Sequence, residues 1–304
     1  MKVAISFLLL ISAGVLSSSD VLGQSLSIRK EAETNYWIEA SAPANNPHTL
    51  QASESLHLWV DIRSPVQEPY SSQLPVASVS KRYFRLIPTP QEAPPIRVML
   101  IGDSLASDCC GWGGAFNSYF KPNATVINYA VGGYSTKVFL QTQEKNNMLL
   151  VKPDYVLLNF GAYDEQPYPS SYTTPQEFVD NLRTIAELIR GFNGIPIFVT
   201  VHAAQAWDAN GNLRPLWRER NNLMKQVAAE LDAPVVDLYQ ASTDLLNELG
   251  RSGSAFMHWE PGGPADVAHL SPLGAQYVAR LAANLLPDVF GPYLTGIFDL
   301  PPKP

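Results

Sequence analysis

The chain has little cysteine: only two of its 304 residues are cysteines, and these are neighbours, Cys109 and Cys110. A disulfide between distant segments therefore cannot form within it, which excludes a small disulfide-stapled fold. A vicinal disulfide in the wall of a site and two buried thiols both remain open for this pair. The histidines are scattered without any Cys/His ligand spacing, so we expect no metal site.

Basic runs and long apolar runs are also scarce. The formal net charge is -7 without a cluster of Lys and Arg, so nucleic acid is not an expected partner. One apolar run, residues 3–16, follows Lys2 and is shorter than the ~20 residues of a membrane-spanning helix. Together with the small and polar residues after it, this run predicts a signal peptide over residues 1–23. We therefore expect a secreted protein, extracellular or periplasmic, whose mature chain does not span a membrane.

The remaining pattern predicts two domains. Apolar residues make up 46% of the chain, which is enough for ordinary hydrophobic cores. Residues 24–90 hold short β-like runs separated by Pro, Ser and Asn clusters, which predicts a small all-β sandwich module. Closely spaced prolines stiffen the segment that follows, and we place a linker at residues 91–95. Residues 96–304 form the second domain.

The second domain alternates apolar runs with amphipathic stretches, a pattern typical of repeated β-α units around a parallel sheet. Five strands are predicted, at residues 97–101, 125–129, 155–160, 195–201 and 234–237. Helices are predicted at residues 174–190, 216–231 and 272–286. We therefore expect a doubly wound, flavodoxin-like α/β fold with three α/β/α layers.

Candidate catalytic residues follow these strands. Ligands bind outside the carboxyl ends of the strands of an open parallel sheet, so residues at those positions are the first candidates for a site. Ser104 follows the first strand, where the start of a helix would expose its hydroxyl. Asp266 and His269 are three residues apart near the C-terminus, so the carboxylate can orient the imidazole while the imidazole accepts the serine proton. The three residues are the candidate nucleophile, orienting acid and base.

Each candidate taken singly also has an ordinary structural interpretation. Asp103 can cap a helix beside a merely solvated Ser104, and Asp266 can be a turn residue. Gly132 and Gly133 can form a plain tight turn. Their joint occurrence at strand ends, in this order and behind an export signal, favours the catalytic interpretation.

Longer stretches around these residues resemble the SGNH or GDSL hydrolases, and within them the rhamnogalacturonan acetylesterase-like carbohydrate esterases. The resembling segments are residues 101–113, 128–136, 198–213, 227–238 and 266–275. The resemblance implies that Ser104 is the nucleophile, His269 the general base and acid, and Asp266 its partner. It also implies that the backbone N–H groups of Ser104 and Gly133 bind the oxyanion, and that the enzyme uses no cofactor. Residues 24–90 are similar to fibronectin-type-III-like modules.

Two positions depart from the family pattern. Tyr163 stands where the family's Gly-x-Asn-Asp motif carries an oxyanion-donating Asn, and losing such a donor can lower kcat by ~10² to 10³. The Tyr163 phenol, water or another side chain can supply the missing donor, whereas Asn159 stands at the wrong place along the strand. His202 replaces a family Arg and can line the pocket, cap the strand end or act as a rival base; of these we expect it to line the pocket. Trp112 and Trp259 are candidates for stacking on sugar rings, with ordinary packing as the alternative.

The sequence therefore predicts a monomeric serine esterase that hydrolyses O-acetyl esters on a polysaccharide such as pectin, rhamnogalacturonan or xylan. Two alternatives remain open. A lipase-like or aryl esterase would differ in its preference for acyl chain length. A weakly catalytic carbohydrate-binding protein would bind glycan without being trapped by a serine-directed organophosphonate.

Overall fold

The computed structural model describes residues 93–165, 168–259 and 266–296, together with the backbone of eight strands before residue 93. The predicted signal-peptide cleavage site after residue 23 and linker residues 91 and 92 lie outside the described residues. The chain divides into two compact units, and each is described by itself. The first comprises Met1–Pro94 with Leu286–Leu300, and the main part of the second is Pro95–Leu285.

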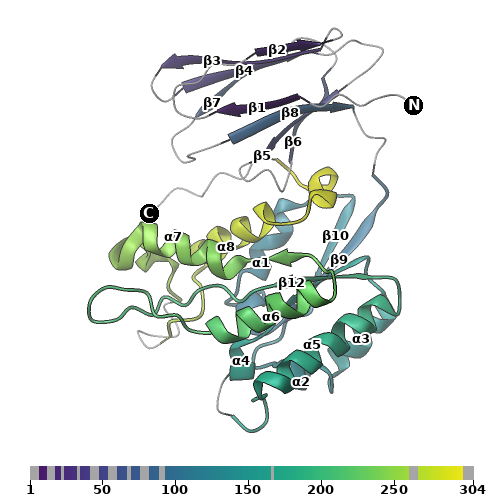
Figure 1. Ribbon diagram of the computed structural model, residues 1–304, viewed down its shortest axis with the longest axis vertical. Helices are drawn as coiled ribbons and strands as arrows, with labels where there is room; N and C mark the ends of the chain where they lie inside the picture. Colours follow the sequence, from purple (N-terminus) through teal and green to yellow (C-terminus); the bar gives the residue numbers. More distant parts are fainter. Residues whose placement is uncertain are drawn as a thin grey trace. The chain divides into compact units, whose positions relative to one another are not determined.

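The first unit contains two antiparallel four-stranded sheets, with strand orders β1-β8-β5-β6 and β2-β3-β4-β7 (Figure 1). The strands are β1 Phe7–Ile11, β2 Ser18–Val21, β3 Gln24–Ala32, β4 Asn35–Ser41, β5 His48–Ser53, β6 Val60–Val66, β7 Tyr70–Pro75 and β8 Arg82–Pro88. Strands β1 and β2 lie in the residues assigned to the signal peptide, whose removal stays a prediction. The fibronectin-like character of residues 24–90 also stays a prediction.

The second unit is built around a five-stranded parallel sheet of order β10-β9-β11-β12-β13. Its strands are β9 Ile96–Gly102, β10 Ala124–Asn128, β11 Tyr155–Asn159, β12 Ile195–Val199 and β13 Val235–Val236. In chain order this is 2-1-3-4-5, the flavodoxin-like arrangement, in which the strand order reverses between the first and third strands, β9 and β11. Because Asn159 pairs with Gly102, strands β9 and β11 end together at one edge, where a ligand crevice is expected.

Helices cover both faces of this sheet. They are α1 Gly113–Phe116, α2 Thr136–Phe139, α3 Gln143–Val151, α4 Ala162–Glu165, α5 Pro175–Arg190, α6 Arg218–Glu230, α7 Leu238–Gly253 and α8 Pro272–Asn284. Three short 3-10 helices are η1 Ser104–Ala106, η2 Asn117–Tyr119 and η3 Ala255–Met257, and a fourth, η5 Asp288–Tyr293, groups with the first unit.

Helix α5 shows how local sequence fixes these elements. Thr174 and Glu177 form a reciprocal capping box, and Pro175 occupies the first helical turn, where no intrahelical N–H bond is needed. Apolar residues then recur at helical spacing and are buried: Phe178, Val179, Leu182, Ile185, Ala186 and Ile189. The helix begins one residue after the predicted start and ends at the predicted residue.

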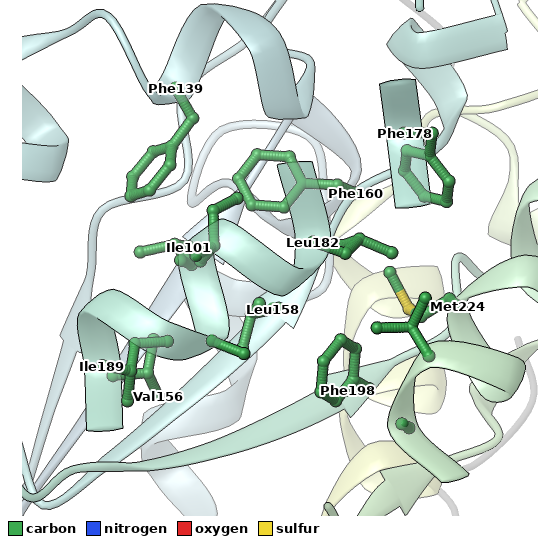
Figure 2. Close-up of a cluster of buried hydrophobic side chains, with 14 of the residues drawn as sticks. Ile101, Phe139, Val156, Leu158, Phe160, Phe178, Leu182, Ile189, Phe198 and Met224 are labelled. Carbon is green, nitrogen blue, oxygen red and sulfur yellow. The ribbon is translucent and has the colours of Figure 1, made fainter. Parts of the chain in front are cut away.

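The main core lies between one face of the sheet and helices α2, α3, α5 and α6. Figure 2 shows Ile101 and Leu158 from the strands packed with Phe178 and Leu182 from α5 and Met224 from α6. Burying each such side chain contributes about 1.5 to 3 kcal/mol. Alternate residues of β9, such as Leu100, point to the other face, where Gly113 of α1 lies against Leu100. The sheet therefore stands between two helical layers, as the sequence predicted.

Some elements differ from the expectations. Strand β13 has two residues instead of four, and the sixteen-residue helix α7 was not expected. Within the described residues, no helix combines the length and the apolar character that crossing a membrane requires.

Candidate active site

Ser104 follows strand β9 closely in the chain. Gly102 ends the strand where a Cβ would stand 2.4 Å from the carbonyl oxygen of Asn159, so only glycine lets β9 and β11 approach there. Asp103 then caps η1 by accepting a hydrogen bond from the Leu105 N–H at 2.9 Å. Ser104 is thus the first residue of η1, and it is only 6% exposed.

The loop before α8 brings His269 and Asp266 to Ser104. His269 Nε2 lies 2.7 Å from Ser104 Oγ, and His269 Nδ1 lies 2.7 Å from Asp266 Oδ2. Burial raises the pKa of Asp266, but hydrogen bonds from His269 and from the Ala268 N–H outweigh it, so the pKa lies below its ordinary value. Asp266 is therefore an anion at neutral pH. It can orient the His269 ring and stabilise its positive charge while His269 Nε2 accepts the Ser104 proton.

The glycine turn after β10 forms a second wall of the site. The Val131 N–H donates to the carbonyl of Gly102 at 3.0 Å, which ties this turn to the end of β9. A Cβ on Gly132 would lie 3.6 Å from Ser104 Cβ, and Gly133 has a φ of 86°. The structure thus brings Gly133, expected from the sequence, close to Ser104.

Tyr163 stands on the third wall, in α4. Its Cε1 atom lies 3.9 Å from where a Cβ on Gly133 would be, so the ring faces the glycine turn. Burial, followed by the negative charge of Asp103, raises the pKa of the Tyr163 phenol. The phenol therefore keeps its proton at neutral pH and can donate a hydrogen bond.

Asn159 is fully occupied elsewhere. Its amide donates to the carbonyls of Val199 and Thr200, at 2.9 and 3.2 Å, and its oxygen accepts from Trp112 Nε1 at 3.3 Å. These bonds tie β11 to β12. Asn159 therefore does not replace the Asn of the family motif, whose position is occupied by Tyr163.

Two buried carboxyl groups flank the site. Burial raises the pKa of Asp103 to about 7, with a further rise from the nearby Asp164. Burial also raises the pKa of Asp164 to about 6, although hydrogen bonds from Thr136 and Thr173 lower it in part. Asp164 thereby joins the start of α2 to α4, which fixes the glycine turn relative to Tyr163.

A cavity of about 200 Å³ opens beside Ser104. It is lined by Ser104, Leu105, Ala162, Tyr163, Tyr168, Trp217, Ala268 and His269. Sequence reasoning missed Leu105, Tyr168 and Trp217. Trp217 could have been proposed from the sequence, because it is an aromatic residue in the loop between β12 and α6, on the ligand-binding edge of the sheet.

The predicted stacking role of Trp112 is wrong. Trp112 has no exposed surface, donates through Nε1 to Asn159, and packs edge-on against Phe116 with ring centroids 5.1 Å apart. Trp259 instead lies beside His269, with its ring edge-on to the His269 ring at a centroid separation of 5.4 Å.

His202 lies behind the site. It is 1% exposed, does not line the cavity, and its Nδ1 lies 3.1 Å from the carbonyl oxygen of Ala203. The expectation that it lines the pocket is therefore wrong. Burial lowers the pKa of His202 to about 4, so the ring is neutral at pH 7.

Cys109 and Cys110 form a vicinal disulfide in the segment after η1. The Leu270 N–H donates to the carbonyl of Cys110 at 2.9 Å, which links this segment to the residue after His269. In the part of the chain that the structure describes, no group of three His, Cys, Asp or Glu side chains is arranged to hold a metal ion.

Comparison with known proteins shows which family the chain resembles. The model of the GDSL-like lipase/acylhydrolase family matches residues 100–277. Rhamnogalacturonan acetylesterase RhgT of Bacillus subtilis (strain 168) is 34% identical over 209 residues, covering 62% of this chain and 89% of RhgT. Probable rhamnogalacturonan acetylesterase YesY of the same strain is 27% identical over 194 residues, covering 62% of this chain and 87% of YesY.

One solved structure is similar in fold across most of the chain. The crystal structure of protein YXIM from Bacillus subtilis superimposes with a TM-score of 0.56 at 16% identity, covering 91% of this chain and 87% of that chain.

Proposed function

Because the chain belongs to the GDSL-like lipase/acylhydrolase family, we propose that it is a serine esterase that removes O-acetyl groups from a polysaccharide. It is a carboxylic ester hydrolase by family. The observation that carries the mechanism is the pair of 2.7 Å contacts that join Ser104 to His269 and His269 to Asp266. This geometry also argues against a purely carbohydrate-binding protein, because binding alone does not require it.

Acylation starts with Ser104. As its Oγ bonds to the ester carbonyl carbon, the hydroxyl proton moves to His269 Nε2 and the carbonyl π pair becomes an oxyanion. The imidazolium that forms is stabilised by the Asp266 carboxylate. When the tetrahedral intermediate collapses, the C–O bond to the sugar breaks and the leaving oxygen takes the proton from His269.

The oxyanion is held by the backbone N–H groups of Ser104 and Gly133 and by the Tyr163 hydroxyl. Two features support Tyr163 as the third donor: its ring faces the Gly133 turn, and its phenol stays protonated at neutral pH.

Deacylation uses the same groups in reverse. Water gives a proton to His269 and attacks the acetyl-Ser104 carbonyl, and collapse returns the proton to Ser104 and releases acetate. No cofactor takes part in either half of the reaction.

The size of the cavity beside Ser104 supports a short acyl group. Its 200 Å³ is below the 300 to 1,000 Å³ usual for pockets of drug-sized ligands, and the rings of Tyr163, Tyr168 and Trp217 surround it. A short acyl group fits this space, which favours an acetyl ester over the lipase-like alternative.

A polysaccharide substrate is supported by the similarity to RhgT, a rhamnogalacturonan acetylesterase that matches 62% of this chain. The signal peptide predicted over residues 1–23 would take the enzyme to extracellular or periplasmic polysaccharide. The fibronectin-like module at residues 24–90 would then act as a glycan-binding or spacing element, and the enzyme would work as a monomer.

The test is acetate release from acetylated rhamnogalacturonan and xylan, together with turnover of 4-nitrophenyl acetate. We expect Ser104→Ala to abolish both activities without changing the melting temperature. Ser252→Ala, an exposed serine on α7, is the matched control and should behave as the original chain. Undiminished turnover by Ser104→Ala would overturn the assignment. Faster turnover of long-chain than of acetyl esters would favour a lipase-like enzyme.

A further inference from the structure

A second, larger cavity lies in the same unit as the catalytic residues. It has a volume of about 580 Å³ and lies between the segment after η1 and the start of α8, with the end of β10 beside it. We call it the Cys109 cavity. It is lined by Asp108, Cys109, Cys110, Gly111, Gly113, Gly114, Ala115, Asn117, Val126, Asn128, Leu270, Pro272, Ala275 and Gln276.

Glycines explain why the wall of this cavity lies so close to the nucleophile. A Cβ on Gly111 would stand 2.3 Å from the Leu105 carbonyl oxygen, and one on Gly113 would stand 2.1 Å from the Ala106 carbonyl oxygen. Only glycine therefore lets this segment pack directly on η1.

The Cys109 cavity shares a wall with the catalytic site. The Leu270 N–H donates to the Cys110 carbonyl at 2.9 Å, and Leu270 directly follows His269. On the opposite side, Cys110 Sγ lies 4.0 Å from the carbonyl oxygen of Ser104. Lining residues of the cavity thus adjoin His269 in the chain and lie next to the Ser104 backbone.

The lining has the mixed character that sugar rings require. Val126, Leu270 and Pro272, with the Cys109–Cys110 disulfide, provide apolar surface for the C–H faces of a ring. The amides of Asn117 and Gln276 provide donors and acceptors for hydroxyl groups at the exposed rim.

The charge of the lining selects neutral ligands. Among the described residues that line the cavity there is no Lys, Arg or His. The charged group in the lining is the carboxylate of Asp108, which accepts a hydrogen bond from Asn128 Nδ2 at 2.6 Å. A uronate or phosphate would meet a like charge without a compensating cation, whereas a neutral sugar would gain an acceptor. Its volume falls within the range of small-molecule binding sites.

We propose that the Cys109 cavity is a subsite that binds neutral sugar residues adjacent to the acetylated one. This inference rests on the proposed esterase function. The polysaccharide then runs from the Ser104 cavity across the Cys110–Leu270 wall, and the subsite raises affinity for oligosaccharide esters without touching the reacting atoms.

The experiment uses two rim substitutions, Asn117→Trp and Gln276→Trp, because both side chains are exposed and an indole at either position would fill the cavity. We expect KM for acetylated xylo-oligosaccharides to rise by about tenfold, equivalent to about 1.4 kcal/mol, with kcat nearly unchanged. Turnover of 4-nitrophenyl acetate should stay within about twofold, since this ester needs only the Ser104 cavity. Gln226→Trp, exposed on α6 on the opposite face of the sheet, is the matched control.

Binding without turnover separates this proposal from the proposed function. Deacetylated xylo-oligosaccharides are titrated calorimetrically into the Ser104→Ala variant with and without the rim substitutions. Binding that the rim substitutions weaken about tenfold supports the subsite even if no ester is hydrolysed. Equal affinity with and without them, an unchanged KM, or tighter binding of oligogalacturonate than of neutral oligosaccharides overturns it. If a Trp variant does not fold, the double variant Asn117→Ala, Gln276→Ala is held to the same criteria.

Discussion

Asp266 holds His269 through both of its carboxylate oxygens: Oδ2 lies 2.7 Å from Nδ1, and Oδ1 accepts from the His269 backbone N–H at 3.0 Å. The same carboxylate therefore fixes the position of the residue and the orientation of its ring. This double contact explains how a loop residue can present Nε2 accurately to Ser104.

Replacing Asp266 by Asn separates these two contributions. An amide can still accept the backbone hydrogen bond, but it carries no charge to stabilise the imidazolium. We expect Asp266→Asn to lower kcat for 4-nitrophenyl acetate by roughly 10² to 10⁴, with little change in melting temperature. Asp244→Asn, an exposed acid on α7, is the control. A variant with full kcat would show that the carboxylate is dispensable.

The Tyr163 hydroxyl can be tested by removing one atom. If it binds the oxyanion, Tyr163→Phe should lower kcat by about 10² while KM for a small ester hardly changes. Tyr163→Asn recreates the family motif and should keep most of the activity. Tyr172→Phe, at an exposed tyrosine, serves as the control. Equal kcat for Tyr163→Phe and the original chain would assign the third donor to another group.

We expect Trp217 to limit the acyl group that the site accepts. It is 6% exposed and lines the Ser104 cavity, so Trp217→Leu should enlarge it. We expect the ratio of kcat/KM for butyrate over acetate esters to rise by about tenfold, the effect of a methylene or two in a fitted pocket. The loss of packing should lower the free energy of unfolding by about 1 to 3 kcal/mol. An unchanged ratio would mean that the acyl chain points elsewhere.

Asp103 should make stability depend on pH. Its pKa of about 7 in the folded state exceeds its ordinary 3.8, so between those values the folded protein binds a proton that the unfolded chain has released. Its contribution to stability therefore falls as the pH rises through that range. His202 acts in the opposite direction, because its folded pKa of about 4 lies below 6.5 and stability is lost as the pH falls through that window.

The variant Asp103→Asn isolates the first of these effects. Its amide mimics the protonated acid, so its free energy of unfolding should fall less between pH 5 and pH 7 than that of the original chain. The expected difference is about 2 kcal/mol in urea denaturation. Asp244→Asn should follow the original chain. Parallel pH profiles for Asp103→Asn and the original chain would contradict the prediction.

Local sequence patterns predicted the elements that hold the site. The apolar runs that became β9 to β12 are buried in a parallel sheet, and the amphipathic periodicity of residues 174–190 became α5. Four-residue helices such as α4 are too short to show periodicity, so they were not predicted.

Side-chain direction was harder to predict. Trp112 is near Ser104 in the sequence, but the tight approach at Gly111 and Gly113 places it in the core, away from the cavity. Trp217 has a φ of 59°, which turns the chain into α6 and puts the indole against the Ser104 cavity. Its place at the ligand-binding edge could be predicted from the sequence, but the positive φ that sets the direction of its ring could not.

Ser104 and His269 are 165 positions apart in the chain, although their side chains meet. In the proposed mechanism, a nascent polypeptide therefore acquires its nucleophile early and its base only when most of the chain has been synthesised. Proteolytic loss of the segment after residue 268 would leave a nucleophile without a base. Hydrolysis of a small ester thus serves as a folding assay, because the signal appears only when both ends of the second unit have come together.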